Sequence, residues 1–240
     1  MSEQWALVTG GAQGIGAATA ARLREDGLRV LIADRVPPTH GDLDEAVVVD
    51  LADVQATQAA LNPLGERLAL TRLVNNAGIV RPATAEEADP FDIDRVAAVN
   101  LRGPLVCLQA VLPAMRREGL GRIVNIASRV ALGKELRTAY AASKAGLIGM
   151  TKTWALELGP LGVTANAIGP GPIRTELFAR VNPDDDPRTQ AIRDGVPVKR
   201  LGEPADVAEA VAFFCSDRAG FVTGQTLYVC GGLTIGGAGA

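Results

Sequence analysis

Short apolar runs rich in Val, Ile and Leu alternate with longer helical patterns along the whole of this chain. Candidate strands lie at 5–9, 28–34, 46–50, 71–77, 121–127, 163–168 and 226–230, and candidate helices at about 14–27, 53–61, 91–118, 138–158 and 204–215. Strands buried on both faces are typical of parallel sheets, in which each connection needs a crossover that is usually a helix. The alternation therefore predicts an α/β fold, a doubly wound seven-stranded parallel sheet flanked by helices.

No composition shift or long linker divides the 240 residues, so we expect a single domain spanning 1–240. Two segments depart from the regular pattern. The connection after Asp34, RVPPTHGDLDE, is too short and too rich in Pro and Gly for a full crossover helix. Residues 176–200 are polar and interrupted by prolines after a strand end, which is typical of a lid over a ligand site.

Charge and cysteine content narrow the choice of function. A net charge of -3 without any cluster of Lys or Arg predicts no nucleic-acid partner. The first residues run straight into a strand pattern and no run of 18 apolar residues occurs, so we expect a cytoplasmic protein without a membrane span. Cys107, Cys215 and Cys230 lie in apolar runs, which favours buried free thiols. His40 has no neighbouring ligand residue, so no metal site is expected.

A glycine-rich turn, TGGAQGIG at 9–16, follows the first strand and precedes a helix of small residues. Glycines in such a turn let backbone N–H groups approach a pyrophosphate at the positive end of the helix. The spacing is G-x-x-x-G-x-G rather than G-x-G-x-x-G, but the strand before it and the helix after it indicate a Rossmann fold that binds a dinucleotide. The residues expected around the cofactor here are Gly10, Gln13, Gly14, Ile15 and Gly16.

Asp34 ends the second strand, where a carboxylate can accept hydrogen bonds from the adenosine ribose. The same carboxylate would repel a 2′-phosphate, so the sequence predicts NAD as the cofactor. Arg35 follows directly and could contact a 2′-phosphate, which keeps NADP as the minority interpretation.

Two further strand ends add candidate cofactor residues. Asp50 and Leu51 lie at the end of the third strand and could meet the adenine. The small residues Asn76, Ala77 and Gly78 lie at the end of the fourth strand, where the chain can pass close to a cofactor. For Asp50 and Asn76 a structural role and a cofactor role are equally open.

Ser128, Tyr140 and Lys144 form the candidate catalytic group. Ser128 lies at the carboxyl edge of the sheet, and Tyr140 and Lys144 in YAASK are one turn apart on the predicted 138–158 helix. A free tyrosine titrates near pH ~10, and a neighbouring ammonium and an oxidised nicotinamide would both favour the phenolate. We therefore expect Tyr140 to transfer a proton, Lys144 to lower its pKa, and Ser128 to hydrogen-bond the substrate oxygen while a hydride moves to or from the cofactor.

The chain resembles the single-domain short-chain dehydrogenase/reductase family over essentially its whole length. The motifs appear in order as TGGAQGIG at 9–16, NNAG at 75–78, VAAVNLRG around Asn100, Ser128, YAASK at 140–144 and GPGPIRT at 169–175. The resemblance implies that Asn100 joins Ser128, Tyr140 and Lys144 as a catalytic tetrad and holds a water that links the lysine to solvent.

The same resemblance implies further contacts. Tyr140 and Lys144 would also contact the cofactor, with Lys144 on the nicotinamide ribose. The other residues implied at the cofactor are Pro170, Gly171, Ile173 and Thr175. By the same resemblance we expect a homotetramer that pairs the long helices at about 91–118 and 138–158, with a second interface near the C-terminus.

Three features depart from the family pattern. Ser128 and Tyr140 are twelve residues apart, one fewer than is common, so the intervening segment RVALGKELRTA is expected to be reshaped. Cys230 stands where relatives usually carry aspartate. The short connection after Asp34 resembles members that act on dihydrodiols.

The sequence thus predicts an NAD-dependent oxidoreductase that interconverts a secondary alcohol and a ketone. The alternatives are an NADPH-dependent 3-oxoacyl-thioester reductase, a dihydrodiol dehydrogenase and, remotely, a cofactor-binding regulator without activity. Substrate identity depends on the orientation of residues that the sequence does not fix. Arg129 could attract an anionic group or face solvent or an interface, and an apolar substrate is favoured if Leu132, Leu136, Leu177 and Phe178 point inward.

Overall fold

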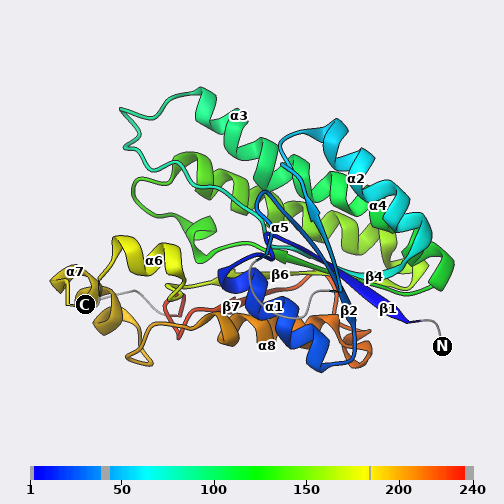
Figure 1. Ribbon diagram of the computed structural model, residues 1–240. Coiled ribbons are helices and arrows are strands. Elements are labelled where there is room, and N and C mark those ends of the chain that lie inside the picture. The colour runs from blue at the N-terminus through cyan, green and yellow to red at the C-terminus, as the bar shows by residue number, and fades with distance from the viewer. Residues whose placement is uncertain (1–2, 39–43, 184, 236–240) are drawn as a thin grey trace.

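A seven-stranded parallel sheet in the order β3-β2-β1-β4-β5-β6-β7 runs through the centre of the molecule (Figure 1). The computed structural model describes residues 3–38, 44–183 and 185–235. The strands are β1 Gln4–Thr9, β2 Arg29–Asp34, β3 Glu45–Val48, β4 Ala69–Asn75, β5 Gly121–Ile126, β6 Val163–Pro170 and β7 Thr226–Val229. This order reverses direction between β1 and β4, so the predicted doubly wound Rossmann fold is confirmed.

Helices cover both faces of the sheet (Figure 1). Those longer than one or two turns are α1 Gly14–Glu25, α2 Val54–Arg67, α4 Gly103–Glu118, α5 Thr138–Leu158 and α8 Pro204–Cys215, and the shorter ones are α3 Phe91–Ala97, α6 Glu176–Val181 and α7 Pro187–Gly195. One core cluster joins the sheet to α2, α4 and α5, and the other joins it to α1 and α8.

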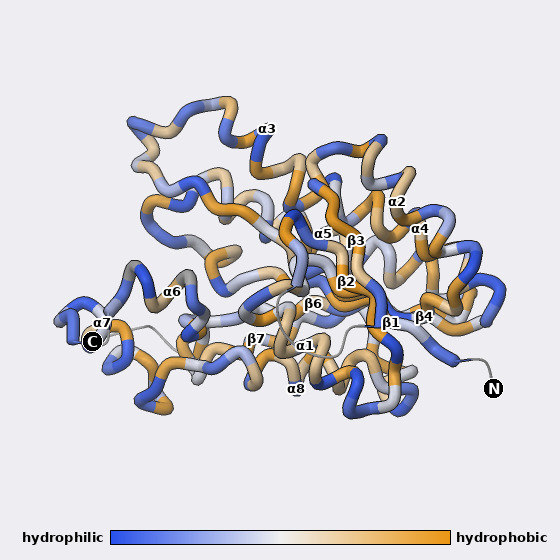
Figure 2. Tube along the Cα trace, viewed as in Figure 1, coloured by the Kyte–Doolittle hydropathy of each residue, from blue (hydrophilic) through white to orange (hydrophobic). Residues whose placement is uncertain are grey.

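Successive side chains of a strand point to opposite faces of the sheet, which explains the two core clusters. Leu7 and Leu31 point into the first cluster, whereas Val8 and Ile32, the next residues on the same strands, point into the second. Every residue of β5 is buried, as expected for a strand covered on both faces. Figure 2 shows the same distribution, with hydrophobic residues along the central strands and hydrophilic ones on the outer turns.

Helix α2 is longer than expected. The sequence predicts an end at about residue 61, before Asn62-Pro63, but the helix continues through Pro63 to Arg67. A Cβ atom added to Gly65 would lie 1.9 Å from the carbonyl oxygen of Ala110 on α4. The close packing of α2 on α4, which only glycine permits here, extends the helix beyond its local signals.

The helix expected at 91–118 is interrupted. A π-helical turn, Ala98–Arg102, separates α3 from α4. The whole segment Phe91–Glu118 is long and apolar enough to cross a membrane by length and composition, but half of its most apolar window is buried inside the protein. Burial of this kind is typical of a core helix, because the apolar side chains already have protein partners.

The two irregular connections differ in content. No helix lies between β2 and β3 in the described part of that connection, as the sequence predicts, and His40 falls outside the described residues. The segment expected as a lid, 176–200, contains the short helices α6 and α7.

Candidate functional site

The glycine-rich turn after β1 crosses the loop after β4 at very short range. Gly10 has φ +64°, and a Cβ atom added to it would lie 2.9 Å from the Cα of Ala77. A Cβ atom on Gly16 would lie 2.0 Å from the carbonyl oxygen of Gly10. Both positions therefore require glycine, and the crossing brings the N-terminus of α1 to the carboxyl edge of the sheet.

A cleft opens along this edge and collects most of the cofactor residues that the sequence predicts. Its lining includes Gly10, Gln13, Gly14, Ile15, Asp34, Arg35, Asp50, Leu51, Asn76, Ala77, Gly78 and Thr175. Sequence reasoning missed Ala33, Val49, Ile79, Val99 and Glu176, which also line it. Each of these five is a neighbour in sequence of a predicted site residue or motif, so extending each strand end by one residue would have found most of them.

Asn76 holds the glycine-rich turn in place. Its Nδ2 donates hydrogen bonds to the carbonyl oxygens of Thr9 and Gly10, at 3.0 and 2.9 Å. The hydroxyl of buried Thr9 in turn accepts from the backbone N–H groups of Asn76 and Ala77. The side chain of Asn76 thus fixes the position of the glycine-rich turn that forms part of the cleft wall.

The carboxylate of Asp34 is fixed by two backbone donors. Oδ2 accepts from the N–H of Ala12 at 3.0 Å, and Oδ1 accepts from the N–H of Val36 at 3.3 Å. The negative charge is therefore held at one end of the cleft. Asp50 is also engaged locally, since its Oδ1 accepts from the N–H of Ala52 at 2.9 Å.

These features fit a dinucleotide. The turn lines the cleft at the positive end of α1, where Gly10 and Gly14 leave the backbone accessible to a phosphate. Asp34 supplies an acceptor for ribose hydroxyls at one end. At the other end Gly78 lines the cleft, and a Cβ atom added there would lie 3.4 Å from the Nζ of Lys144.

The candidate catalytic side chains meet beside Gly78, where β5 ends and α5 begins. Ser128 follows β5 and caps a short 3-10 helix, Arg129–Leu132, accepting from the N–H of Val130 at 3.1 Å. Tyr140 and Lys144 occupy the first two turns of α5. The Nζ of Lys144 donates to the carbonyl oxygen of Ile126 at 2.7 Å and lies 5.6 Å from the centre of the Tyr140 ring.

In the chain without a cofactor, burial dominates the pKa values of Tyr140 and Lys144, and the expectation that Lys144 and an oxidised nicotinamide together favour the phenolate stays a prediction. Burial raises the pKa of Tyr140, and a hydrogen bond with Ser128 and the charge of Arg137 oppose that rise. Burial also lowers the pKa of Lys144 to about 8. Water-poor surroundings disfavour the charged form of both groups.

Asn100 lies in the π-helical turn between α3 and α4, fully buried. Its Oδ1 accepts from the N–H of Ile79, and its Nδ2 donates to the carbonyl oxygen of Ile79 and to Ser143 Oγ, both at 3.0 Å. Ser143 Oγ donates to the carbonyl oxygen of Tyr140 at 2.8 Å. Sequence reasoning missed this link through Ser143, although its place one residue before Lys144 in YAASK was a signal.

Six of the expected cofactor residues are not part of the cleft lining: Gly16, Tyr140, Lys144, Pro170, Gly171 and Ile173. Of these, Ile173 lines a second cavity together with Cys230. A Cβ atom added to Gly171 would lie 2.7 Å from the Cα of Cys230, so this glycine allows two chain segments to touch. The cofactor roles of Pro170, Gly171 and Ile173 stay predictions.

All three cysteines are free and buried, as the sequence predicts. Burial raises the pKa of Cys107 and Cys215 to about 12. Cys230 differs, because its Sγ lies 3.4 Å from Thr234 Oγ1 and hydrogen bonds from the following turn lower its pKa.

Comparison with known proteins agrees with this geometry. Residues 10–234 match the family model described as enoyl-(acyl carrier protein) reductase. The chain is 38% identical over 241 residues, covering 96% of each protein, to the (2S)-[(R)-hydroxy(phenyl)methyl]succinyl-CoA dehydrogenase subunit BbsD of Thauera aromatica. It belongs to the short-chain dehydrogenase/reductase family and is an oxidoreductase of that type.

Solved structures show the same fold with nicotinamide cofactors. A putative NAD(P)-dependent gluconate 5-dehydrogenase from Beutenbergia cavernae, with bound NADP, superposes with a TM-score of 0.92 at 35% identity and 98% coverage of both chains. A 3-ketoacyl-(acyl-carrier-protein) reductase from Brucella melitensis, complexed with NADH, gives a TM-score of 0.86 at 32% identity, covering 98% of this chain and 99% of the other. This protein is thus similar to enzymes that bind either nicotinamide dinucleotide.

Proposed function

We propose that this protein is an NAD-dependent oxidoreductase that interconverts a secondary alcohol and a ketone. The observation that carries the proposal is the junction at Gly78, which lines the cofactor cleft and packs against Lys144. A bound nicotinamide dinucleotide would accept or supply the hydride. The reacting carbon then has a proton donor and acceptor, Tyr140, within the same corner of the sheet edge.

Each candidate catalytic residue has a separate role, which its surroundings set. In ketone reduction, Tyr140 gives its proton to the substrate oxygen, and its raised pKa keeps it protonated beforehand. Ser128 donates a hydrogen bond to the same oxygen as charge develops. Lys144, as an ammonium, stabilises the phenolate that remains, and Asn100 holds the backbone of α5 through Ser143.

Replacing Tyr140 by Phe tests the proposal directly. We expect kcat for any accepted alcohol or ketone to fall roughly 1000-fold, because the proton has no other buried donor at that position. Binding of NADH, measured by fluorescence titration, should stay within about twofold, since the hydroxyl is the only group removed. Unchanged turnover in the variant would contradict the proposal.

The choice of NAD rests on Asp34, whose two oxygens are held by the backbone at the ribose end of the cleft. In Asp34→Ser we expect the preference for NADH over NADPH, as a ratio of kcat/KM, to fall about tenfold or more, because the repulsion of a 2′-phosphate is gone while Arg35 remains. Asp50→Asn is the matched control, since it removes a carboxylate from the same cleft away from that ribose. A wild-type protein that prefers NADPH would refute the assignment.

A second candidate is an NADPH-dependent 3-oxoacyl-thioester reductase. The similarity to the 3-ketoacyl-(acyl-carrier-protein) reductase of Brucella melitensis supports the acyl substrate, and the description of the matching family model also names the acyl carrier protein. Assays of acetoacetyl-CoA reduction with each cofactor separate the two. Reduction with NADPH that far exceeds oxidation of any free alcohol with NAD would favour this candidate.

We also propose that the protein is a homotetramer. Large apolar side chains are exposed on the helices expected to pair, among them Phe91 on α3 and Leu156 on α5, which is 81% exposed. Phe221 and Ile235 are exposed near the C-terminus. Light scattering after size exclusion should give a mass near four times 24.9 kDa. A mass of one chain would refute the proposal.

A further inference from the structure

The segment between Ser128 and Tyr140 carries an excess of positive charge. Arg129, Lys134 and Arg137 lie in it with only one carboxylate, Glu135. Arg129 follows the candidate catalytic serine directly, and Arg137 is the residue that precedes α5, three positions before Tyr140. We call residues 129–137 the cationic loop.

The cationic loop is anchored at both ends. Its start is a 3-10 helix capped by the Ser128 hydroxyl. Its end pairs with the segment after β4, where Ala83 and Arg137 form a β-bridge and the N–H of Ala83 donates to the carbonyl oxygen of Leu136 at 3.2 Å. Leu136 adopts φ +60°, a backbone conformation rarely used by leucine. Because strained backbone of this kind persists only where neighbouring contacts fix it, the loop presents its charges in a set arrangement.

Glu135 is the single carboxylate within the cationic loop. Among the residues that the structure describes, no ion pair involves Arg129, Lys134 or Arg137, and the Nη1 of Arg137 donates only to the carbonyl oxygen of Leu136. Burial and the repulsion of Arg129 and Arg137 lower the pKa of Lys134, although Glu135 opposes this. The positive charge of Arg137 also acts on the phenol of Tyr140, where it opposes the rise in pKa that burial causes. Arg129 and Arg137 are half-buried and Lys134 is exposed, so an anion that joined the two arginines would meet positive charge that water only partly screens.

We propose that the cationic loop binds a carboxylate of the substrate, so that the enzyme acts on short hydroxy acids and the corresponding oxo acids. This rests on the proposed oxidoreductase function. In the oxidation, Tyr140 acts as the phenolate, after its own proton has passed to solvent. The carbinol C–H bond breaks and its hydride passes to oxidised NAD, while the O–H proton passes to the phenolate oxygen and the carboxylate is unchanged. Arg129 follows Ser128 directly and Arg137 precedes Tyr140 by one helical turn, so both arginines start close to a candidate catalytic hydroxyl, and we expect the anion they bind to lie near the reacting carbon. The phosphates of a coenzyme A thioester lie at the far end of a long arm and fit this placement less well.

Matched acid and amide substrates test the charge requirement. With NAD, 3-hydroxybutyrate, mandelate and gluconate are compared with 3-hydroxybutyramide, mandelamide and gluconamide, and with 3-hydroxybutyryl-CoA. We expect kcat/KM for at least one acid to exceed that of its amide by about tenfold or more, which is the usual strength of a charge-assisted hydrogen bond. Amides used as well as their acids, or use of the thioester alone, would overturn the inference.

Two variants test whether the arginines of the cationic loop bind the substrate carboxylate. In Arg129→Gln and Arg137→Gln, KM for the acid should rise about tenfold with little change in kcat, and the parameters for the amide should stay the same. Lys152→Gln, which removes an exposed charge from α5, is the matched control and should change neither. Equal effects on acid and amide would overturn the inference.

A binding measurement separates this inference from the proposed function. The thermal midpoint is measured with NADH and each acid or amide, without turnover. A larger rise with the acid, lost in Arg137→Gln, supports the carboxylate site even if no substrate is turned over, and in that case only the proposed function fails. Equal rises with acid and amide, alongside turnover of neutral alcohols, would leave the proposed function intact and refute the carboxylate site.

Discussion

Strand β5 contributes to two buried cation sites that differ in how many partners the cation has. Toward its start, Arg122 lies opposite Arg72 of β4 in the parallel register, and the two side chains are only 5% and 3% exposed. At its end, the carbonyl oxygen of Ile126 accepts from Lys144, which is 2% exposed. Four residues of extended chain, about 13 Å, separate positions 122 and 126.

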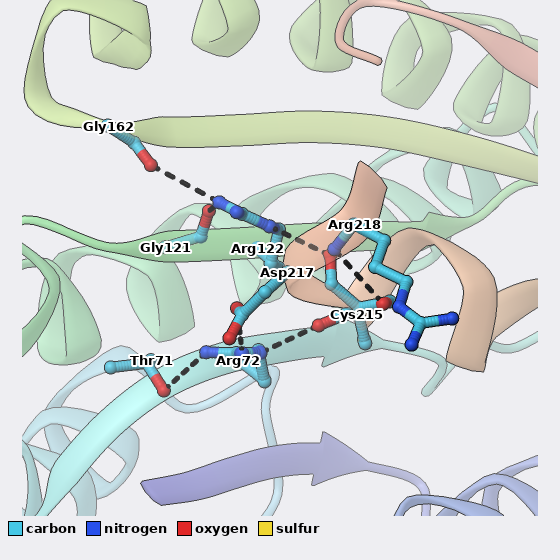
Figure 3. A network of polar contacts seen from close by, with 9 residues as sticks. Thr71, Arg72, Gly121, Arg122, Gly162, Cys215, Asp217 and Arg218 are labelled. Carbon is cyan, nitrogen blue, oxygen red and sulfur yellow. Dashed lines mark hydrogen bonds and ion pairs between the residues drawn. The ribbon is translucent and has the colours of Figure 1, made fainter. Parts of the chain in front are cut away.

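The arginine pair is surrounded by acceptors (Figure 3). Arg72 donates to the carbonyl oxygen of Cys215 at 2.8 Å, to Thr71 Oγ1 at 2.7 Å and to the carboxylate of Asp217 at 2.6 Å. Arg122 donates to the carbonyl oxygens of Gly121, Gly162 and Ser216. Burial and the neighbouring Arg72 lower the pKa of Arg122, and Asp217 opposes this. The pair thus joins the sheet to the negative end of α8.

Lys144 is equally buried but has a single hydrogen-bond acceptor and the face of the Tyr140 ring. An ammonium has three N–H donors, so two remain for a ligand or water. The comparison teaches that burial alone does not mark a functional cation. Among the described residues, Arg72 and Arg122 each use three of five N–H donors on groups of the fold, whereas Lys144 uses one of three. A buried cation with several acceptors in the fold stabilises the fold, whereas one with a single acceptor is able to stabilise something that binds.

Replacing Arg72 by Met should give the largest effect and tests whether the arginine pair stabilises the fold and not the activity. We expect the free energy of unfolding to fall by about 3 kcal/mol, because buried acceptors such as the carbonyl of Cys215 lose their donor. Activity per folded molecule should stay within about twofold, since the candidate active site lies at the other end of the sheet. Urea denaturation followed by circular dichroism measures the first quantity and an alcohol assay the second. A stable variant with lost activity would break the distinction.

Lys144→Met should show the reverse pattern. We expect kcat/KM to fall about 100-fold, because the positive charge that stabilises the Tyr140 phenolate is gone. The free energy of unfolding should change by no more than about 1 kcal/mol, since methionine fills similar space without a buried charge. Steady-state kinetics and the same urea experiment are the measurements. A loss of stability as large as that of Arg72→Met would show that the two cations are alike.

The pH dependence offers a finer test. The pKa of Lys144 is lowered to about 8, so the ammonium falls from about nine tenths at pH 7 to about one tenth at pH 9, and kcat/KM for ketone reduction should fall about tenfold over that range. For stability the sign is opposite. Between pH 8 and the ordinary lysine range the unfolded chain binds more protons, so this group's contribution to the free energy of unfolding rises with pH. Both trends should be absent in Lys144→Met, and a decline in activity that persists in this variant would assign it to another group.

Much of the fold could be predicted because its signals are local. Apolar runs gave all seven strands, and the limits of α5 and α8 coincide with the expected ranges. Gly159 and Pro160 mark the end of α5, and Pro204 and a capping box mark the start of α8. The glycine-rich turn and Asp34 were found for the same reason, since their chemistry depends on position after a strand. Asn100 was the exception, because a buried asparagine within a helical pattern has no local signature and only the resemblance pointed to it.

The sequence by itself determined the parallel sheet, the turn that receives a dinucleotide, and the one-turn spacing of Tyr140 and Lys144, because each follows from backbone periodicity. Only the tertiary structure decided the π-helical turn at Asn100, the extension of α2 past Pro63, and the raised pKa of Tyr140. It also decided which buried cations have several hydrogen-bond acceptors in the fold and which has one. These properties depend on contacts between residues far apart in the chain and on how much water those contacts exclude, which no local pattern records.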